Sequence, residues 1–125
     1  MSTSGRSPAE TLLAVQLEQD GIPFRQEFRF APPRRWRADF MVMDRVPFKG
    51  GEVNHARLLV EIDGGGFVAG RHSRGAGIEK DAEKQSAAAI LGYRVIRVTP
   101  RQVEDGRALS WIKAALGLED SRDAA

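Results

Sequence analysis

The stretch from Leu58 to Gly66 constrains the fold of this chain more than any other. An apolar run, Leu58 to Val60, leads into Glu61 and Asp63, and a glycine cluster follows at once. In a β-strand, residues i and i+2 point to the same side, so both carboxylates should project together from the end of a central strand. Two like charges on a mostly buried strand repel each other and lose hydration. A chain tolerates this where a cation neutralises the pair, so we expect the rest of a site to converge here.

Composition narrows the kind of site. The chain has 125 residues, enough for one domain, and 42% are hydrophobic, which predicts a packed globule and not a disordered chain. It contains no cysteine and two histidines, which excludes disulfides and argues against a zinc site. A metal would therefore be held by carboxylate and carbonyl oxygens, which favours magnesium, manganese or calcium. The apolar runs are far shorter than the roughly 20 residues of a membrane span, and residues 1–7 lack a signal peptide's apolar segment. We expect a soluble, cytoplasmic protein.

The first element should be a helix. Ser7-Pro8-Ala9-Glu10 has the N-cap, first-position proline and third-position glutamate typical of a helix start, and Gly21 should end the helix just after Asp20. Glu10 shares the apolar stripe of Leu13, Ala14 and Leu17. Two interpretations remain open: Glu10 completes a capping box, or it reaches into a site.

Three strands should follow as a meander. Residues 24–30 roughly alternate, residues 36–42 form a second strand, and a third strand runs from residue 55 or 56 to residue 63. Residues 44–54 contain Pro47, Gly50 and Gly51 and are expected to form a hairpin-like loop. Asp39 lies inside the second strand, where it either pairs with an arginine or faces Glu61 on the neighbouring strand.

The remainder predicts helix, strand and helix. Residues 64–77 hold six glycines and should form a loop, and residues 78–91 form an alanine-rich helix that ends at Gly92. Residues 93–98 form a fourth strand, residues 101–116 a last helix and residues 118–125 a loose tail. The order α-β-β-β-α-β-α predicts one α/β domain, residues 1–117, with a mixed central sheet flanked by helices on both faces and a crossover that can make the fourth strand parallel to its partner.

Several short motifs follow one another in an order that a known protein superfamily shares: Glu10, Trp36-Arg37-Ala38-Asp39-Phe40, Val60-Glu61-Ile62-Asp63-Gly64-Gly65, Arg71-His72, Asp81-Ala82-Glu83-Lys84 and Gly92-Tyr93-Arg94-Val95-Ile96-Arg97-Val98-Thr99. Together they cover nearly the whole chain and resemble the PD-(D/E)xK nuclease superfamily. The nearest likeness is to very-short-patch mismatch nickases and to phage-type Holliday junction resolvases. The resemblance implies a restriction-endonuclease-like core.

The resemblance also implies roles for individual residues. Asp39 and Glu61 would be metal ligands, the carbonyl of Ile62 another, and Glu10 would lie in or next to the metal shell. Mg²⁺ is the implied cofactor, and Mn²⁺ should substitute for it. The family's lysine is expected where this chain has Asp63, so either Asp63 adds a ligand or binds water, or the lysine has moved. The candidates for a moved lysine are Lys84 first and Lys80 second, with His72 as a further catalytic candidate.

The implied activity is metal-dependent hydrolysis of phosphodiester bonds in DNA. We expect a structure-specific endonuclease, above all a homodimeric Holliday junction resolvase of a bacterium or phage that acts on branched DNA, because a chain this small favours recognition of shape over sequence. A mismatch nickase, with Trp36 and Phe67 as candidate intercalating aromatics, and a non-catalytic DNA-binding module with the same fold are the alternatives. The rim that would bind the nucleic-acid backbone consists of basic residues, which also fit an ordinary solvated surface: Arg34, Arg35, Arg37, Arg71, Arg74 and Lys80.

Overall fold

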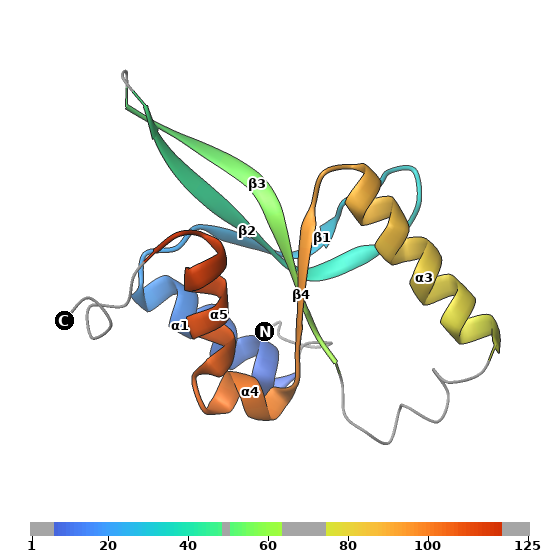
Figure 1. Ribbon diagram of the computed structural model, residues 1–125. Coiled ribbons are helices and arrows are strands. Elements are labelled where there is room, and N and C mark those ends of the chain that lie inside the picture. The colour runs from blue at the N-terminus through green and yellow to red at the C-terminus, as the bar shows by residue number, and fades with distance from the viewer. Residues whose placement is uncertain (1–6, 49–50, 64–74, 119–125) are drawn as a thin grey trace.

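The computed structural model describes residues 7–48, 51–63 and 75–118, and it is a small α/β protein built on one four-stranded mixed sheet (Figure 1). The elements run in the order α1 (Pro8–Gln19), β1 (Phe24–Arg29), β2 (Arg37–Phe48), β3 (Gly51–Ile62), α3 (Gly75–Ile90), β4 (Arg94–Val98), α4 (Pro100–Glu104) and α5 (Arg107–Ala115). None of the described helices combines the length and apolar character needed to cross a membrane.

The sheet has the expected topology. Its strand order is β1-β2-β3-β4, in which β1, β2 and β3 pair antiparallel and β4 pairs parallel with β3. A parallel neighbour requires a crossover, and α3 supplies it between β3 and β4. The predicted meander and crossover are therefore confirmed.

Helices cover both faces of the sheet, as predicted. On one face of the sheet lie α1, α4 and α5 (Figure 1). They enclose the larger core, in which Leu13, Leu17 and Ile112 pack against Phe40 and Val60 of the sheet. On the other face lies α3, whose Ala88 joins a smaller cluster with Met41 and Leu59. Burial of these side chains, worth about 25 cal/mol per Å² of apolar surface, fixes which face of each element points inward.

The start of α1 follows its sequence signals. The Ser7 hydroxyl accepts a hydrogen bond from the Glu10 N–H at 3.1 Å, Pro8 occupies the first turn, and Gly21 ends the helix with φ of +69°. This local chemistry places Glu10 on the buried side of α1, where the residue is 5% exposed.

The two largest differences from expectation concern the second hairpin and the last helix; in addition, α3 begins at Gly75 and not at residue 78, and residues 64–74 of the predicted loop lie outside the described residues. The predicted loop over residues 44–54 is wrong, because β2 and β3 continue pairing as far as Phe48 and Gly51 and form a two-stranded arm that projects from the body (Figure 1). Strand β2 has no β1 partner beyond Val42, and a strand with a free edge tolerates a proline such as Pro47.

The predicted last helix is also wrong as a single element. It is two helices, α4 and α5, separated by Asp105 and Gly106. Gly106 adopts φ of +90°, a left-handed conformation that no continuous α-helix contains. Of the predicted tail, residues 119–125 lie outside the described residues.

Candidate active site at the end of the sheet

Charged residues occupy neighbouring positions across all four strands. Phe40 pairs with Val60, so the next residues along, Asp39 and Glu61, lie beside each other. Glu27 of β1 falls opposite Asp39, between the pairs Gln26–Phe40 and Phe28–Ala38, and Arg97 of β4 pairs directly with Glu61. The sequence expectation that Asp39 faces Glu61 is therefore met by the register.

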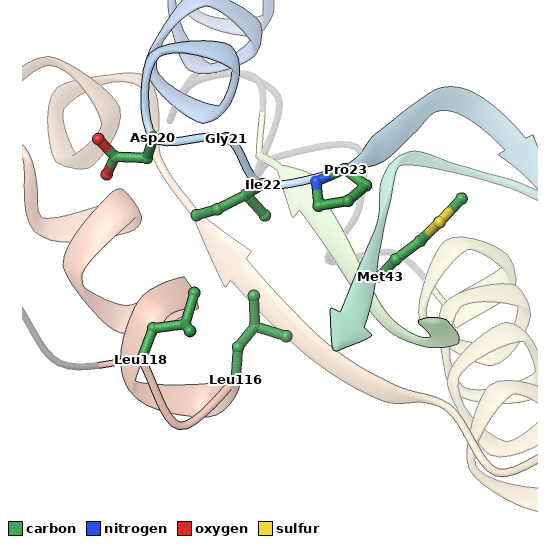
Figure 2. A pocket seen from close by; sticks show the side chains of 7 residues that line it. All are labelled: Asp20, Gly21, Ile22, Pro23, Met43, Leu116 and Leu118. Carbon is green, nitrogen blue, oxygen red and sulfur yellow. The ribbon is translucent and has the colours of Figure 1, made fainter. Parts of the chain in front are cut away.

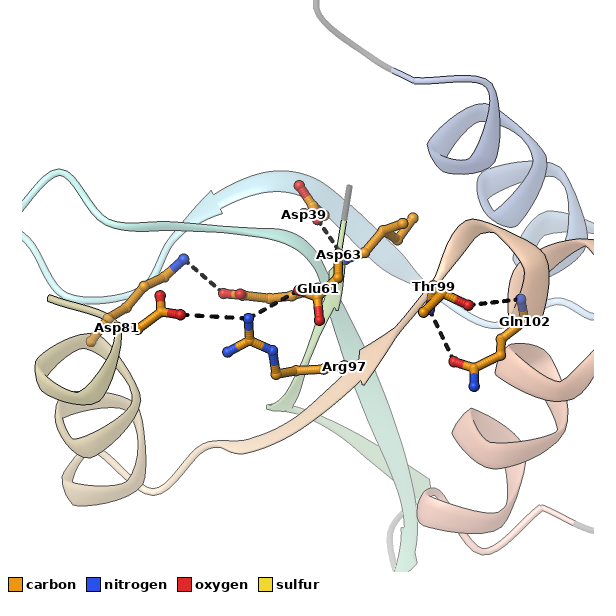
Figure 3. Close-up of polar contacts among 9 residues, drawn as sticks. Asp39, Glu61, Asp63, Asp81, Arg97, Thr99 and Gln102 are labelled. Atoms are coloured by element: carbon orange, nitrogen blue, oxygen red, sulfur yellow. Dashed lines mark hydrogen bonds and ion pairs between the residues drawn. The ribbon is translucent and has the colours of Figure 1, made fainter. Parts of the chain in front are cut away.

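Asp39 is anchored at the end of β3. Its Oδ2 accepts a hydrogen bond from the Ile62 backbone N–H at 2.7 Å (Figure 3). The carboxyl is half-buried, and burial raises its pKa above the ordinary value, an effect that the Ile62 N–H opposes and the charges of Glu27 and Glu61 reinforce. Burial of Asp39 therefore costs less free energy when its carboxyl is uncharged.

The Glu10 side chain approaches Asp39 from helix α1, which packs against the sheet. Its Oε2 lies 3.5 Å from the Gln26 side-chain nitrogen of β1. One carboxylate oxygen from each of Glu10, Glu27 and Asp39 lies within 4.8 Å of the others. Of the two interpretations left open for Glu10, its place in this acidic cluster favours the one in which it reaches into a site.

Glu27 belongs to this cluster, although its sequence context did not single it out. Its backbone has φ of +52°, which is rare for a residue with a side chain and breaks the alternation of β1. Period-2 patterning therefore could not assign Glu27 to the face of the acids. The sequence feature that could have identified Glu27 as a site residue is an acidic residue inside a predicted strand.

Lys84 approaches Glu61 from α3. Its Nζ lies 2.8 Å from Glu61 Oε2, and this ion pair is the dashed line that reaches the labelled Glu61 in Figure 3. The two side chains are 23% and 18% exposed. A pair this sheltered from solvent is screened less by salt than a surface pair. The structure thus brings the first-choice lysine, and not Lys80, which is exposed, to the acid that carries the family resemblance.

Asp63 has a different partner. Its Oδ1 accepts a hydrogen bond from the Arg97 guanidinium at 2.9 Å, and Asp81 of α3 lies 3.7 Å from the same nitrogen (Figure 3). The bond to Asp63 raises the pKa of Arg97 further above its ordinary value. Arg97 stood in a recognised motif but had no assigned role, because its pairing depends on the register between β3 and β4.

Only some residues of the predicted basic rim are among those that the structure describes. Arg34 pairs with Glu83 at 2.6 Å and stacks 3.9 Å above the Trp36 ring, Arg35 is exposed, and Arg37 lies 3.8 Å from Glu27. Arg71, His72 and Arg74 lie outside the described residues.

A separate pocket of about 110 Å³ lies beside Asp20 and Gly21, where α1 ends (Figure 2). Its walls are mainly apolar, and its one charged residue, Asp20, pairs with Lys113 at 3.2 Å. Its lining residues are Asp20, Gly21, Ile22, Pro23, Met43, Leu116 and Leu118.

The acidic cluster suits a hard divalent cation. Around one Mg²⁺, ligand oxygens about 2.1 Å from the ion lie roughly 3–4 Å from each other. The oxygens of Glu10, Glu27 and Asp39 are within 4.8 Å, so small side-chain rotations would bring them onto one ion. No family model, curated protein or solved structure matches the chain.

Proposed function

We propose that this chain is a magnesium-dependent endonuclease that hydrolyses phosphodiester bonds in DNA, with Mn²⁺ able to replace Mg²⁺. The observation that carries the proposal is the contact of 2.8 Å between Lys84 Nζ and Glu61 Oε2. It places an ammonium group beside the strand-end acid, one strand away from Asp39. The resemblance to PD-(D/E)xK nucleases calls for this combination of acids and lysine.

The acids divide into two groups. Glu10, Glu27 and Asp39 form the oxygen cluster that would hold the ion, while Glu61 is in contact with Lys84. When bound, a divalent ion supplies a water of lowered pKa and stabilises charge on the scissile phosphate. Lys84 would hold the attacking water or a phosphate oxygen, which is the task of the lysine that the family places at position 63.

The proposed substrate is branched DNA, cut by a homodimer in the manner of a Holliday junction resolvase. Within the described residues, one sheet and its helices make up the whole fold, so recognition would rest on the shape and backbone of the substrate. Two copies related by a two-fold axis would place two sites on two strands.

One alternative, a non-catalytic DNA-binding module, also has an observation in its favour. Glu61 is neutralised by Lys84, and Asp63 by Arg97, so both strand-end acids are paired without a metal ion. The mismatch nickase has less support. Trp36 stacks on Phe30 with ring centroids 6.3 Å apart and lies beneath Arg34, and Phe67 is outside the described residues.

The decisive experiment incubates the purified protein with a four-way junction, a mismatched duplex and a linear duplex, each with Mg²⁺, with Mn²⁺ and with EDTA. The same reactions are run with Asp39→Asn and Glu61→Gln. Glu104→Gln, on the exposed surface of α4, is the matched control because it removes one carboxylate charge away from the acidic cluster.

The proposal predicts paired symmetric nicks in the junction that require a divalent ion, disappear in both site variants and persist in Glu104→Gln. Cleavage of the mismatched duplex on one strand alone would favour the nickase. Binding of DNA without cleavage under any divalent ion would establish the non-catalytic alternative and end the nuclease proposal.

A further inference from the structure

Helix α3 is held to the rest of the protein in two different ways. Its last turns pack through Ala88, which is 1% exposed. Its first half differs: Ile78 is 52% exposed, and the contacts described for residues 79–84 are ion pairs. The pairs are Lys84–Glu61, Asp81–Arg97 and Glu83–Arg34. The position of Lys84 therefore depends on charge more than on apolar packing.

Arg97 connects the sheet to this half of α3. Its guanidinium donates to Asp63 at 2.9 Å and lies 3.7 Å from Asp81. The backbone beside it is fixed as well, because the Asp63 N–H donates to the Val98 carbonyl at 2.7 Å. Arg97 is 33% exposed, so its donors face both carboxylates from a partly sheltered position.

These contacts close a ring around the proposed catalytic lysine. Asp81 and Lys84 are three residues apart and share one face of α3. Glu61 is the next-to-last residue of β3, and Asp63 follows the strand directly and is held to β4 through its backbone N–H. Lysine has a long, flexible stem that loses rotamer freedom when it is held, and a second tether one turn away keeps the helix where the stem can reach.

We propose that Arg97 is a positioning residue: by holding Asp81 of α3 to Asp63 of the sheet, it places Lys84 on Glu61, and it does not itself bind the DNA backbone. Asp63, which stands where the family has its lysine, acts through Arg97. The consequence for cleavage rests on the proposed function. The consequence for α3 does not.

The cleavage test compares Arg97→Gln with Arg101→Gln, which removes the same charge from the exposed surface of α4. We expect kcat of Arg97→Gln to fall about 10- to 100-fold, with KM for DNA equal to that of the control. In a Lys84→Ala background, Arg97→Gln should cause no further loss, because Arg97 acts through that lysine. The proposal would be overturned if Arg97→Gln raised KM and also lowered, by about one, the slope of log DNA affinity against log salt concentration. That result would mean that Arg97 binds a DNA phosphate.

The second test needs no activity. Hydrogen exchange is measured on the free protein, and amides 77–84 should exchange about 3-fold faster or more in Arg97→Gln than in Arg101→Gln, as expected for loss of a partly exposed ion pair. Amides 86–90, near Ala88, should be unchanged. Equal exchange over residues 77–84 refutes the positioning role even if the protein cleaves DNA.

Asp81→Asn serves where Arg97→Gln fails to fold, since it removes the α3 side of the contact and leaves Arg97 bound to Asp63. The same loosening of residues 77–84 is expected, and its absence counts against the proposal. A protein that cleaves nothing but shows the loosening would refute the nuclease function and leave the positioning role of Arg97 supported.

Discussion

Replacement of Asp39 by asparagine should stabilise the protein in the absence of metal. The change removes one negative charge from a cluster of acids while keeping an oxygen that can accept the hydrogen bond from the Ile62 N–H. Burial raises the pKa of Asp39, so its charged form costs folding free energy at neutral pH. A side chain kept for function at the expense of stability should behave in this way.

The expected magnitude follows from the cluster geometry. At 4.8 Å, the limit set by the oxygens of Glu10, Glu27 and Asp39, two unit charges repel by about 3.5 kcal/mol at an effective dielectric of 20 and about 0.9 kcal/mol at 80. The half-buried position and side-chain rotation favour the lower figure, so loss of repulsion from Glu10 and Glu27 yields roughly 2 kcal/mol, while Glu61 and Lys84 act on Asp39 with opposite signs. The weaker, uncharged bond to Ile62 offsets about 1 kcal/mol. The net gain is about 1 kcal/mol, or about 4 °C in Tm.

The assay is urea and thermal unfolding of wild type, Asp39→Asn and the control Glu104→Gln in EDTA at pH 7.5. The sign of the pH dependence is fixed by the raised pKa of Asp39. Above its folded-state pKa the charged carboxyl destabilises wild type; as the pH falls through that value the proton binds and the penalty disappears. The gap between wild type and Asp39→Asn should therefore close on acidification.

Magnesium should reverse the order. An ion that binds the folded state stabilises it by mass action, so wild type should gain Tm on addition of Mg²⁺ and Asp39→Asn should gain less. If Asp39→Asn is less stable than wild type in EDTA at pH 7.5, the reasoning from burial and repulsion is wrong. If the gap widens on acidification, the raised pKa is wrong.

Three further changes test separate parts of the structure. Lys84→Gln should slow DNA cleavage by about 100-fold or more, and an unchanged rate would show that the lysine has not moved to α3, leaving Lys80 and His72 to be tested. Glu27→Gln should raise the Mg²⁺ concentration for half-maximal cleavage by about tenfold. The control Glu18→Gln, on the exposed side of α1, should leave that concentration unchanged. Equal Mg²⁺ requirements in the two variants would show that Glu27 is not a metal ligand. Gly106→Ala should lower the free energy of unfolding by about 1 kcal/mol, measured by urea unfolding, because φ is +90° there although a Cβ would meet open space; an unchanged stability would contradict the backbone argument.

Much of the fold could be predicted from local chemistry. The helix start at Ser7 to Glu10 depends on a cap and a proline that read the same in sequence and in structure. The meander and the parallel crossover follow from strand and helix order, because topology rules leave few other arrangements. The position of Asp39 beside Glu61 follows from the same reasoning, since antiparallel pairing of adjacent strands places their ends together.

The features that could not be predicted from the sequence depend on backbone conformation or on the register between strands. Glu27 was missed because φ of +52° reverses the alternation that assigns faces. The break at Asp105 and Gly106 carried an Asp-Gly turn signal that helical periodicity on either side obscured. The partner of Asp63 could not be predicted, because which β4 residue meets it depends on a register set by packing across the sheet.

The topology of the site also predicts the stage of folding at which it is completed. The β2–β3 arm joins strands that are adjacent in sequence, so its pairing needs only a short loop closure, whereas β4 reaches β3 only after α3 has crossed the sheet. Asp39 and Glu61 are therefore brought together by local pairing, and Lys84 arrives with the crossover. We expect the acids to meet before their counter-charge, so that docking of α3, which brings Lys84 to Glu61, relieves a repulsion that the hairpin has created.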